Sequence, residues 1–327
     1  FALFEAYVSW GVLSIFPANL WHSDPLYIEE GRGLRVRSTF PHPILFGDAL
    51  AMVIPMALYL LSTSKERPQR VILWMITLLM FWGLYKTSSR GPWLALGISC
   101  ILLFFLVHNR IRKYLTLLAL LTVLVLVTRP GIRQTLVDLY DSTQDSTSRL
   151  GSSFEYRHAL IPAVTNALAK SPARMLLGYG LGTFREIGLD IHFLGITQRW
   201  HTCDNNWALF LYETGYLGLI TVTILLFKPL LMTLQAYRRM PRPEKYFIAV
   251  IFISLASFYF DLMSVAGYNW GQQGYMAWIL ISLSVIYPRI AKRDRRNASR
   301  QKIPSAAPLA EPQPDLQQVQ SVWSSTV

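Results

Sequence analysis

The sequence has little charge and almost no cysteine. Of its 327 residues only 15% are charged and 52% are hydrophobic, whereas a soluble domain carries about 25% charged residues. This shortfall argues against a soluble enzyme. Cys100 lies in an apolar run and Cys203 in a polar segment, so we expect no structural disulfide. The histidines are scattered without metal-ligand spacing, and we therefore expect no metal and no other cofactor.

The positive charge that is present lies between long apolar runs. The net charge is +12, a value that often indicates a nucleic-acid partner. Here the lysines and arginines cluster at the ends of apolar stretches, and the clusters fall on one side of a membrane if each stretch crosses it. The charge therefore predicts membrane topology, and we expect no nucleic-acid partner.

Apolar stretches suited to membrane helices recur along the chain. About 20 mostly apolar helical residues cross the hydrocarbon core of a bilayer. The predicted spans are residues 43–61, 71–85, 92–107, 114–127, 207–227, 246–266 and 276–287. Residues 1–20 are a weaker candidate, which would span, re-enter or lie at the interface. Because the chain opens with Phe, we expect upstream sequence to be missing.

The predicted architecture is an all-α, polytopic transmembrane helical bundle. Residues 1–128 form its N-terminal membrane helices, 129–206 a large exterior loop, and 207–288 its C-terminal membrane helices. Residues 289–327 form a basic tail on the cytoplasmic side, which we expect to be disordered because Pro, Gln, Ser and Ala dominate from Asn297 onward. The other exterior segments are 21–42 and the turn at 88–91.

Arg90 is the first candidate for a binding residue. It lies in the exterior turn Ser89-Arg90-Gly91-Pro92, which leads into an apolar helix. A cation at a helix N-terminus opposes the helix dipole, whereas the free amide groups there favour an anion. An anionic ligand would resolve this conflict. The alternative is that the side chain only extends to the lipid headgroups.

A second group of exterior arginines lies before residue 43. Arg32, Arg35 and Arg37 could bind phosphate through paired hydrogen bonds, and we favour Arg37 because it is nearest to the predicted helix. The alternative is that Glu29 and Glu30 simply neutralise these charges.

Arg157 lies in the exterior loop before Ile161, Val164 and Leu168, at spacings that place it on the apolar face of a continuous helix. A charge there requires a partner or a ligand. Pro162 would instead remove Arg157 from that face if the helix began near residue 160. A structural ion pair with Glu155 is a further alternative.

Polar side chains gather immediately before the predicted helix at 207–227. His201 and Asp204 could each accept a proton from a sugar hydroxyl if the pKa suits that role. Asp and Asn are also preferred helix caps, so capping and catalysis are equally strong interpretations of Asp204. The glycine-rich residues 178–184 lack the strand and helix of a nucleotide-binding loop, and a tight turn is the better interpretation.

Together these segments resemble the O-antigen ligase and Wzy-type polysaccharide polymerase superfamily of bacterial membrane proteins. The resemblance rests on residues 37–44, 89–92, 178–184 beyond Arg157, and 204–205 leading to 213–218. It implies a glycosyltransferase type C-like architecture in the inner membrane, with residues 129–206 as a periplasmic catalytic loop and a cytoplasmic C-terminus. It also implies an inverting, metal-independent enzyme that polymerises or ligates glycans carried on undecaprenyl pyrophosphate.

The resemblance implies roles for particular residues. Arg90, Arg157 and Arg37 would bind the pyrophosphate, while Asp204 or His201 would act as the base towards the acceptor hydroxyl. The supporting residues would be His42, Asn205 and Glu213.

Many ligases have His-Asn where this chain has Asp204-Asn205, and this difference favours an O-antigen or exopolysaccharide polymerase over a ligase. The partners would be the lipid-linked oligosaccharide, a glycan or lipid A core acceptor, the bilayer and a chain-length regulator. Two rival functions remain. One is a transporter or flippase of lipid-linked saccharides, and the other is a non-catalytic subunit.

Overall fold

The computed structural model describes residues 1–11, 15, 26–29, 33–129, 131, 133–134, 137–138, 140–141, 145, 149–242, 244–267 and 271–301. Arg32, Glu30 and residues 302–327 of the predicted tail lie outside this part of the chain. The chain divides into two compact units, Phe1–Val285 and Ile286–Val327, and each is considered by itself.

Each of the seven predicted spans overlaps a helix, although α11 ends at Asp261, before the predicted bound of 266. Of the weaker candidate at 1–20, residues 1–11 and 15 are described, and their helix is α1 (Ala2–Tyr7). The helices at the seven spans are α2 (Pro43–Thr63), α3 (Arg67–Lys86), α4 (Arg90–Leu106), α5 (Asn109–Thr128), α10 (Asn206–Arg239), α11 (Glu244–Asp261) and α12 (Gly271–Gln301). Of these, 4 are long and apolar enough to cross a membrane, namely α2, α5, α10 and α12. The prediction of an all-α, polytopic helical bundle is confirmed.

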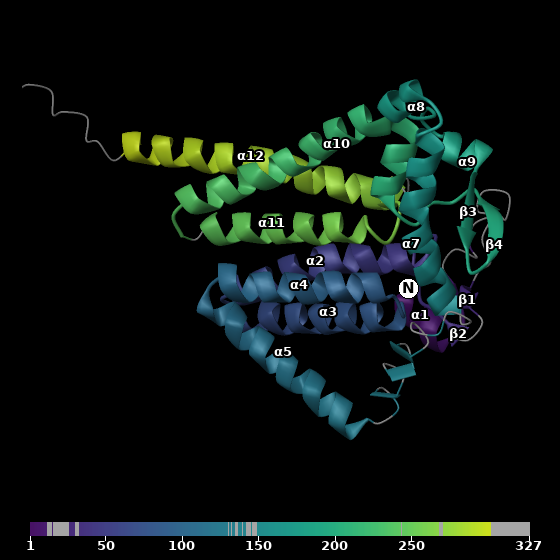
Figure 1. Ribbon diagram of the computed structural model, residues 1–327. Coiled ribbons are helices and arrows are strands. Elements are labelled where there is room, and N and C mark those ends of the chain that lie inside the picture. The colour runs from purple at the N-terminus through teal and green to yellow at the C-terminus, as the bar shows by residue number, and fades with distance from the viewer. Residues whose placement is uncertain are drawn as a thin grey trace, which may run out of the picture. The chain divides into compact units, whose positions relative to one another are not determined.

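Helix α2 is at the centre of the bundle, in contact with α3, α4 and α11, while α10 packs on α11 (Figure 1). Leu58, Leu103 and Ile253 are buried between these helices. Helices α2 and α4 approach closely at Gly47, where an added Cβ would lie 2.8 Å from Cγ of Pro92. This packing fixes the N-terminal ends of α2 and α4, which carry part of the candidate site.

A second layer packs on the N-terminal part of α10. It contains α7 (Arg149–Leu168), α8 (Pro172–Leu177), α9 (Thr183–Ile187) and the antiparallel strands β3 (Leu189–Phe193) and β4 (Ile196–Trp200). Near the chain start are α1 (Ala2–Tyr7) and the short strands β1 (Ile28–Glu29) and β2 (Gly33–Leu34). Leu160, Val164, Phe184 and Tyr212 form the core of the second layer. This core is separate from the one between the membrane helices, and it holds the free thiol of Cys203.

The structure settles the two interpretations of α7. The helix continues through Pro162, so the interpretation that α7 begins near residue 160 is wrong. The buried face, however, contains Tyr156, Leu160 and Val164, whereas Ile161 is 49% exposed. Arg157 therefore lies at the edge of the apolar face and not within it.

The glycine-rich segment packs against a kink in α10. Gly215 interrupts that helix with φ 65° and ψ −169°, which leaves carbonyl groups without their usual helical donors. The backbone amides of Tyr179 and Gly180 donate to the carbonyls of Tyr212 and Glu213, at 3.0 and 2.9 Å. The amide of Thr183 also donates to the Gly180 carbonyl, which confirms the predicted turn.

The end of α12 differs from the expected tail. Helix α12 continues to Gln301, so the prediction of disorder is wrong for residues 289–301. Ala, Lys and Arg are good helix formers, and they extend the helix beyond its apolar part.

Candidate functional site

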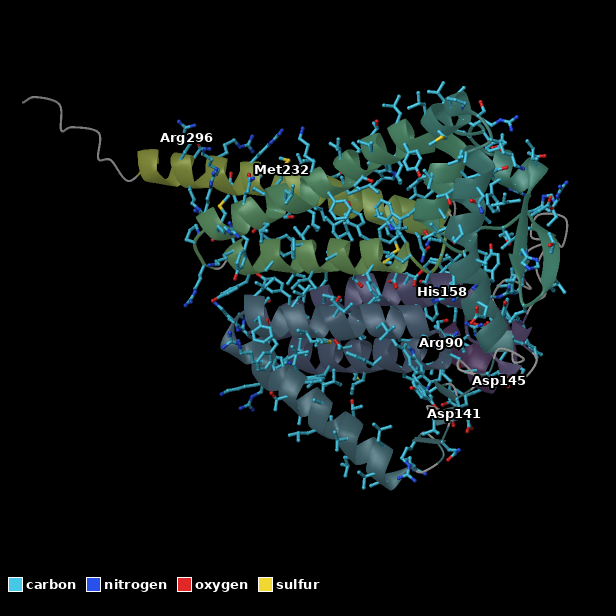
Figure 2. The ribbon with its side chains drawn as sticks, viewed as in Figure 1. Arg90, Asp141, Asp145, His158, Met232 and Arg296 are labelled. Carbon is cyan, nitrogen blue, oxygen red and sulfur yellow. The ribbon has the colours of Figure 1, made fainter. Side chains whose placement is uncertain are left out.

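An open cavity of about 850 Å³ lies where the first residues of α2 and α4 meet α7 and the start of α10. Figure 2 labels Arg90 at this end of α4 and His158 on α7. The charged and imidazole side chains that line it are Arg35, Arg90, Arg157, Arg185, Glu29, Asp204, Glu213, His42 and His201. Segments distant in the sequence thus bring four arginines and three acids to one cavity.

Arg90 follows a tight turn in which Ser88 has φ 48°, a backbone conformation that residues other than glycine rarely adopt. Its neighbour Gly91 faces Ser264, and an added Cβ would lie 2.7 Å from that Oγ. The pKa of the Arg90 guanidinium is lowered, mainly by burial and further by the charges of Arg157 and Arg35. Three cations therefore repel one another here, and an anion would relieve that repulsion.

Arg157 reaches the cavity from α7. Its Nη2 lies 3.5 Å from Oδ2 of Asp204 and donates to the Ser264 carbonyl at 3.4 Å. Both distances exceed the 2.7–2.9 Å typical of strong charge-assisted hydrogen bonds. Its Nε has no hydrogen-bond partner among the described residues. The alternative of an ion pair with Glu155 is not what the structure has, because Arg157 pairs with Asp204 while Glu155 is exposed. The guanidinium retains donors for a ligand.

Asp204 lies in the cavity wall opposite Arg157. Loss of solvation raises the pKa of its carboxyl group, and the charge and hydrogen bond of Arg157 oppose this shift. Its carboxylate is 44% exposed and does not cap α10, since both capping hydrogen bonds come from Asn205. Of the two interpretations that the sequence left open for Asp204, capping is excluded.

His201 lies at the rim of the same cavity. Its Nδ1 is 2.9 Å from the Arg185 carbonyl, and because a carbonyl can only accept, Nδ1 carries the hydrogen. In the neutral ring Nε2 therefore holds the lone pair and can accept a proton. The ring packs against Gly188, where an added Cβ would lie 2.9 Å from Cε1. The structure thus fixes the tautomer of a second potential base.

Arg37 does not line the cavity, whereas Arg35 does. The Arg37 guanidinium is buried and donates to the Pro41 carbonyl at 3.2 Å, while the Arg37 amide donates to Glu5. The choice of Arg37 as a cavity residue is therefore corrected. The physical reason is that the Pro41 carbonyl and the Glu5 carboxylate bind its side chain and backbone inside the protein.

Arg35 holds the turn before Arg90. It forms an ion pair with Glu29, and it donates to the Thr87 carbonyl at 2.9 Å and to Oγ of Ser89 at 2.8 Å. For Arg35, the correct interpretation is therefore that Glu29 neutralises its charge. Its role is to tie the β1–β2 hairpin to the start of α4.

The expected supporting residues have distinct positions. Nδ1 of His42 caps α2 by accepting from the Ile44 amide at 3.2 Å, and its Nε2 bonds the Tyr27 hydroxyl at 2.9 Å. Glu213 lines the cavity and accepts from the Phe184 amide at 3.4 Å. Asn205 does not line it.

Asn205 caps α10, with Oδ1 accepting from the amides of Trp207 and Ala208 at 2.9 and 3.1 Å. We expect Asn205→Ala to lower the free energy of unfolding by about 1 kcal/mol, because two amides lose their acceptor. Asn205→Asp should retain most of the stability. Thermal unfolding of the purified protein measures both, and equal losses in the two variants would contradict the capping role.

Two buried acids that the sequence analysis did not select lie outside the cavity lining. Asp48 in α2 and Asp261 at the end of α11 interact directly through their carboxyl groups. Nε2 of Gln273 donates to Asp48 at 2.8 Å, while neither oxygen of Asp261 accepts a hydrogen bond from another described group. Two buried carboxyl groups in contact repel each other when both are ionised. The sequence held a signal for both acids, because each lies inside a predicted span, where ionisable residues are rare.

Arg185 is a further cavity residue that the sequence analysis did not select. It directly follows the glycine-rich residues 178–184, and the fold of α9 brings it to the cavity. Among the described residues, no group of three or more His, Cys, Asp or Glu is arranged to hold a metal ion.

The family model for O-antigen ligase matches residues 75–223, which include Arg90, Arg157, His201, Asp204 and Glu213. Residues 75–223 belong to the O-antigen ligase family. A comparison with curated proteins finds no match. With its apolar helices, the chain is an integral membrane protein, and its match to the O-antigen ligase family covers residues 75–223. Residues 75–223 supply most of the polar cavity wall, and those from outside this segment are Tyr27, Glu29, Arg35, His42 and Ser264.

Proposed function

We propose that the protein is a membrane glycosyltransferase that transfers glycans from undecaprenyl pyrophosphate, as a polymerase of O-antigen or exopolysaccharide. The observation that carries the proposal is that one cavity contains Arg90 and Arg157 together with Asp204 and His201. Cations suited to a pyrophosphate and groups suited to a hydroxyl thus lie close enough to act on one substrate pair. Membership of the O-antigen ligase family supports the substrate class.

The reaction is a displacement at the anomeric carbon. The acceptor hydroxyl oxygen forms a bond to that carbon, the bond to the pyrophosphate oxygen breaks, and the hydroxyl proton passes to a protein base. Arg90 and Arg157 stabilise the negative charge that develops on the leaving pyrophosphate. Attack opposite the leaving group inverts the configuration. Retention in the product, seen by NMR, would exclude this mechanism.

Asp204 is our proposed base. Burial raises the pKa of its carboxyl group, and a carboxylate must be ionised to accept a proton. The rate should therefore rise with pH through a value above the ordinary 3.9 or so of aspartate. This acid limb should disappear in Asp204→Asn. A limb that persists in Asp204→Asn and disappears in His201→Gln would assign the base to His201.

We infer the location of the reaction from the distribution of charge. Arg110 and Arg242, from two basic loops, line one cavity together with Tyr59 near the end of α2. The candidate site lies at the opposite ends of α2 and α4. Since basic loops prefer the cytoplasm, we place the candidate site in the periplasm, the C-terminus in the cytoplasm and the bundle in the bacterial inner membrane. A type C-like architecture, a catalytic loop at 129–206 and a chain-length regulator as partner are further parts of this proposal.

The decisive experiment uses the protein in liposomes with an undecaprenyl-pyrophosphate-linked oligosaccharide. A ladder of longer lipid-linked glycans is the expected product and establishes a polymerase. A single transfer to supplied lipid A core would establish a ligase instead. If no glycosidic bond forms while the lipid-linked sugar crosses the bilayer, the protein is a transporter and the enzymatic proposal fails.

A further inference from the structure

A second cavity, of about 740 Å³, lies at the opposite ends of α2 and α4 from the candidate site. The last turns of α2, α4 and α10 and the first residues of α5 and α11 form its wall. None of its lining residues belongs to the proposed catalytic cavity. Its cationic side chains are Arg110, Arg112, Arg242 and Lys245.

The charged side chains that line this cavity are all basic. No described residue that lines the cavity is an Asp or Glu. Within the described residues, none of Arg110, Arg242 and Lys245 forms an ion pair. Burial lowers the pKa of the neighbouring His108, and the charge of Arg110 lowers it further. The side chains that line the cavity therefore carry positive charge and no negative charge.

Neutral contacts hold the basic side chains in place. Nη1 of Arg110 donates to the Ser62 carbonyl at 2.8 Å, which leaves further N–H donors on the same guanidinium. Nζ of Lys245 lies 4.5 Å from the centre of the Tyr237 ring. The arginines could have the purely structural role of capping helix ends, but an arginine that caps a helix keeps its positive charge.

Two helix N-termini bring amide donors to the wall, whereas the last turns of α2, α4 and α10 present carbonyl groups to the same cavity. Helix α5 begins at Asn109 and α11 at Glu244, and the first residues of both contribute to the wall. Free amides and the helix dipole make the first turn of a helix favourable for phosphate. Apolar surface adjoins the basic cavity, since Phe105 lines it and is 69% exposed, and Leu60 of α2 is 51% exposed. A phosphate with attached acyl chains matches both surfaces.

We propose that this cavity binds the phosphate of an anionic phospholipid, with the acyl chains along the apolar surface near Phe105. Basic pockets between membrane helices are suited to such headgroups. The site is distinct from the proposed catalytic cavity, so it does not depend on the glycosyltransferase assignment.

The test measures thermal unfolding of the detergent-solubilised full chain while phosphatidylglycerol, phosphatidylcholine or inorganic phosphate is added. A ligand that binds the folded state raises the unfolding temperature. We expect phosphatidylglycerol alone to do so at low concentration. In the variant with Arg110, Arg242 and Lys245 replaced by Gln, the concentration for half the effect should rise roughly 100-fold. The matched control replaces Lys65, Arg67 and Arg239 by Gln, with the same change of charge outside the cavity.

Equal loss of the phosphatidylglycerol effect in the two triple variants would overturn the proposal, because general surface charge would then explain binding. An equal effect of inorganic phosphate and phosphatidylglycerol would assign the cavity to free phosphate and overturn the lipid assignment. If the cavity variant fails to fold by circular dichroism, Lys245→Gln against Lys65→Gln provides the same comparison. There the expected difference is roughly fivefold.

Discussion

Product formation is expected to fall roughly 100- to 1000-fold when Arg90 or Arg157 is replaced by alanine, because each removes a cation from the leaving pyrophosphate. Both guanidinium groups face the same cavity, and Arg157 retains an Nε without a partner among the described residues. The liposome assay with a lipid-linked oligosaccharide measures the loss. Arg→Lys at either position should recover part of the rate, since lysine keeps the charge but not the paired hydrogen bonds.

The matched control is Arg199→Ala. Arg199 lies in β4 and pairs with Asp190 at 2.7 Å on the surface, but it does not line the cavity. Exposed ion pairs contribute little to stability, so this variant should keep wild-type activity. Wild-type activity in both Arg90→Ala and Arg157→Ala would instead support the interpretation as a non-catalytic subunit.

Gly178→Ala is expected to lower the free energy of unfolding by about 3 kcal/mol or more. Its φ of +72° is unfavourable for a side chain, and the added Cβ would lie 2.4 Å from the backbone carbon of Glu213. Gly215→Ala should act in the same way, since its Cβ would lie 2.5 Å from the backbone carbon of Leu176. Neither backbone can move without breaking the contact between the glycine-rich segment and α10. Thermal unfolding in detergent measures both effects.

Gly195→Ala separates the two causes. Gly195 has a similar φ of +76°, but an added Cβ there meets nothing within 4 Å. This control should lose only about 1–2 kcal/mol, from the backbone conformation alone. If Gly178→Ala and Gly195→Ala destabilise the protein equally, close approach to α10 is not the reason for glycine at position 178.

The membrane helices could be predicted well from the sequence, because apolar length alone determines whether a segment can satisfy its backbone within a bilayer. The candidate site was predicted in part. Arg90, Arg157, His201, Asp204, Glu213 and His42 all line the cavity, although their roles stay proposals.

Other site features depended on contacts between distant segments. Arg35 and Arg37 are two positions apart and equally basic, and only the contact with Glu29 and the turn before α4 places Arg35 in the cavity wall. Likewise, no local pattern links Gly178 to Gly215, since each needs glycine because of the other segment's backbone.

The sequence by itself determined the membrane helices, their basic ends and the segments that carry polar chemistry, because these depend on local composition. Only the tertiary structure decided which arginine faces the cavity, that Asn205 and not Asp204 caps α10, and that Nδ1 of His201 carries the hydrogen. These features depend on partners up to dozens of residues away. Their energies come from hydrogen bonds and desolvation, which arise only once the segments have packed together.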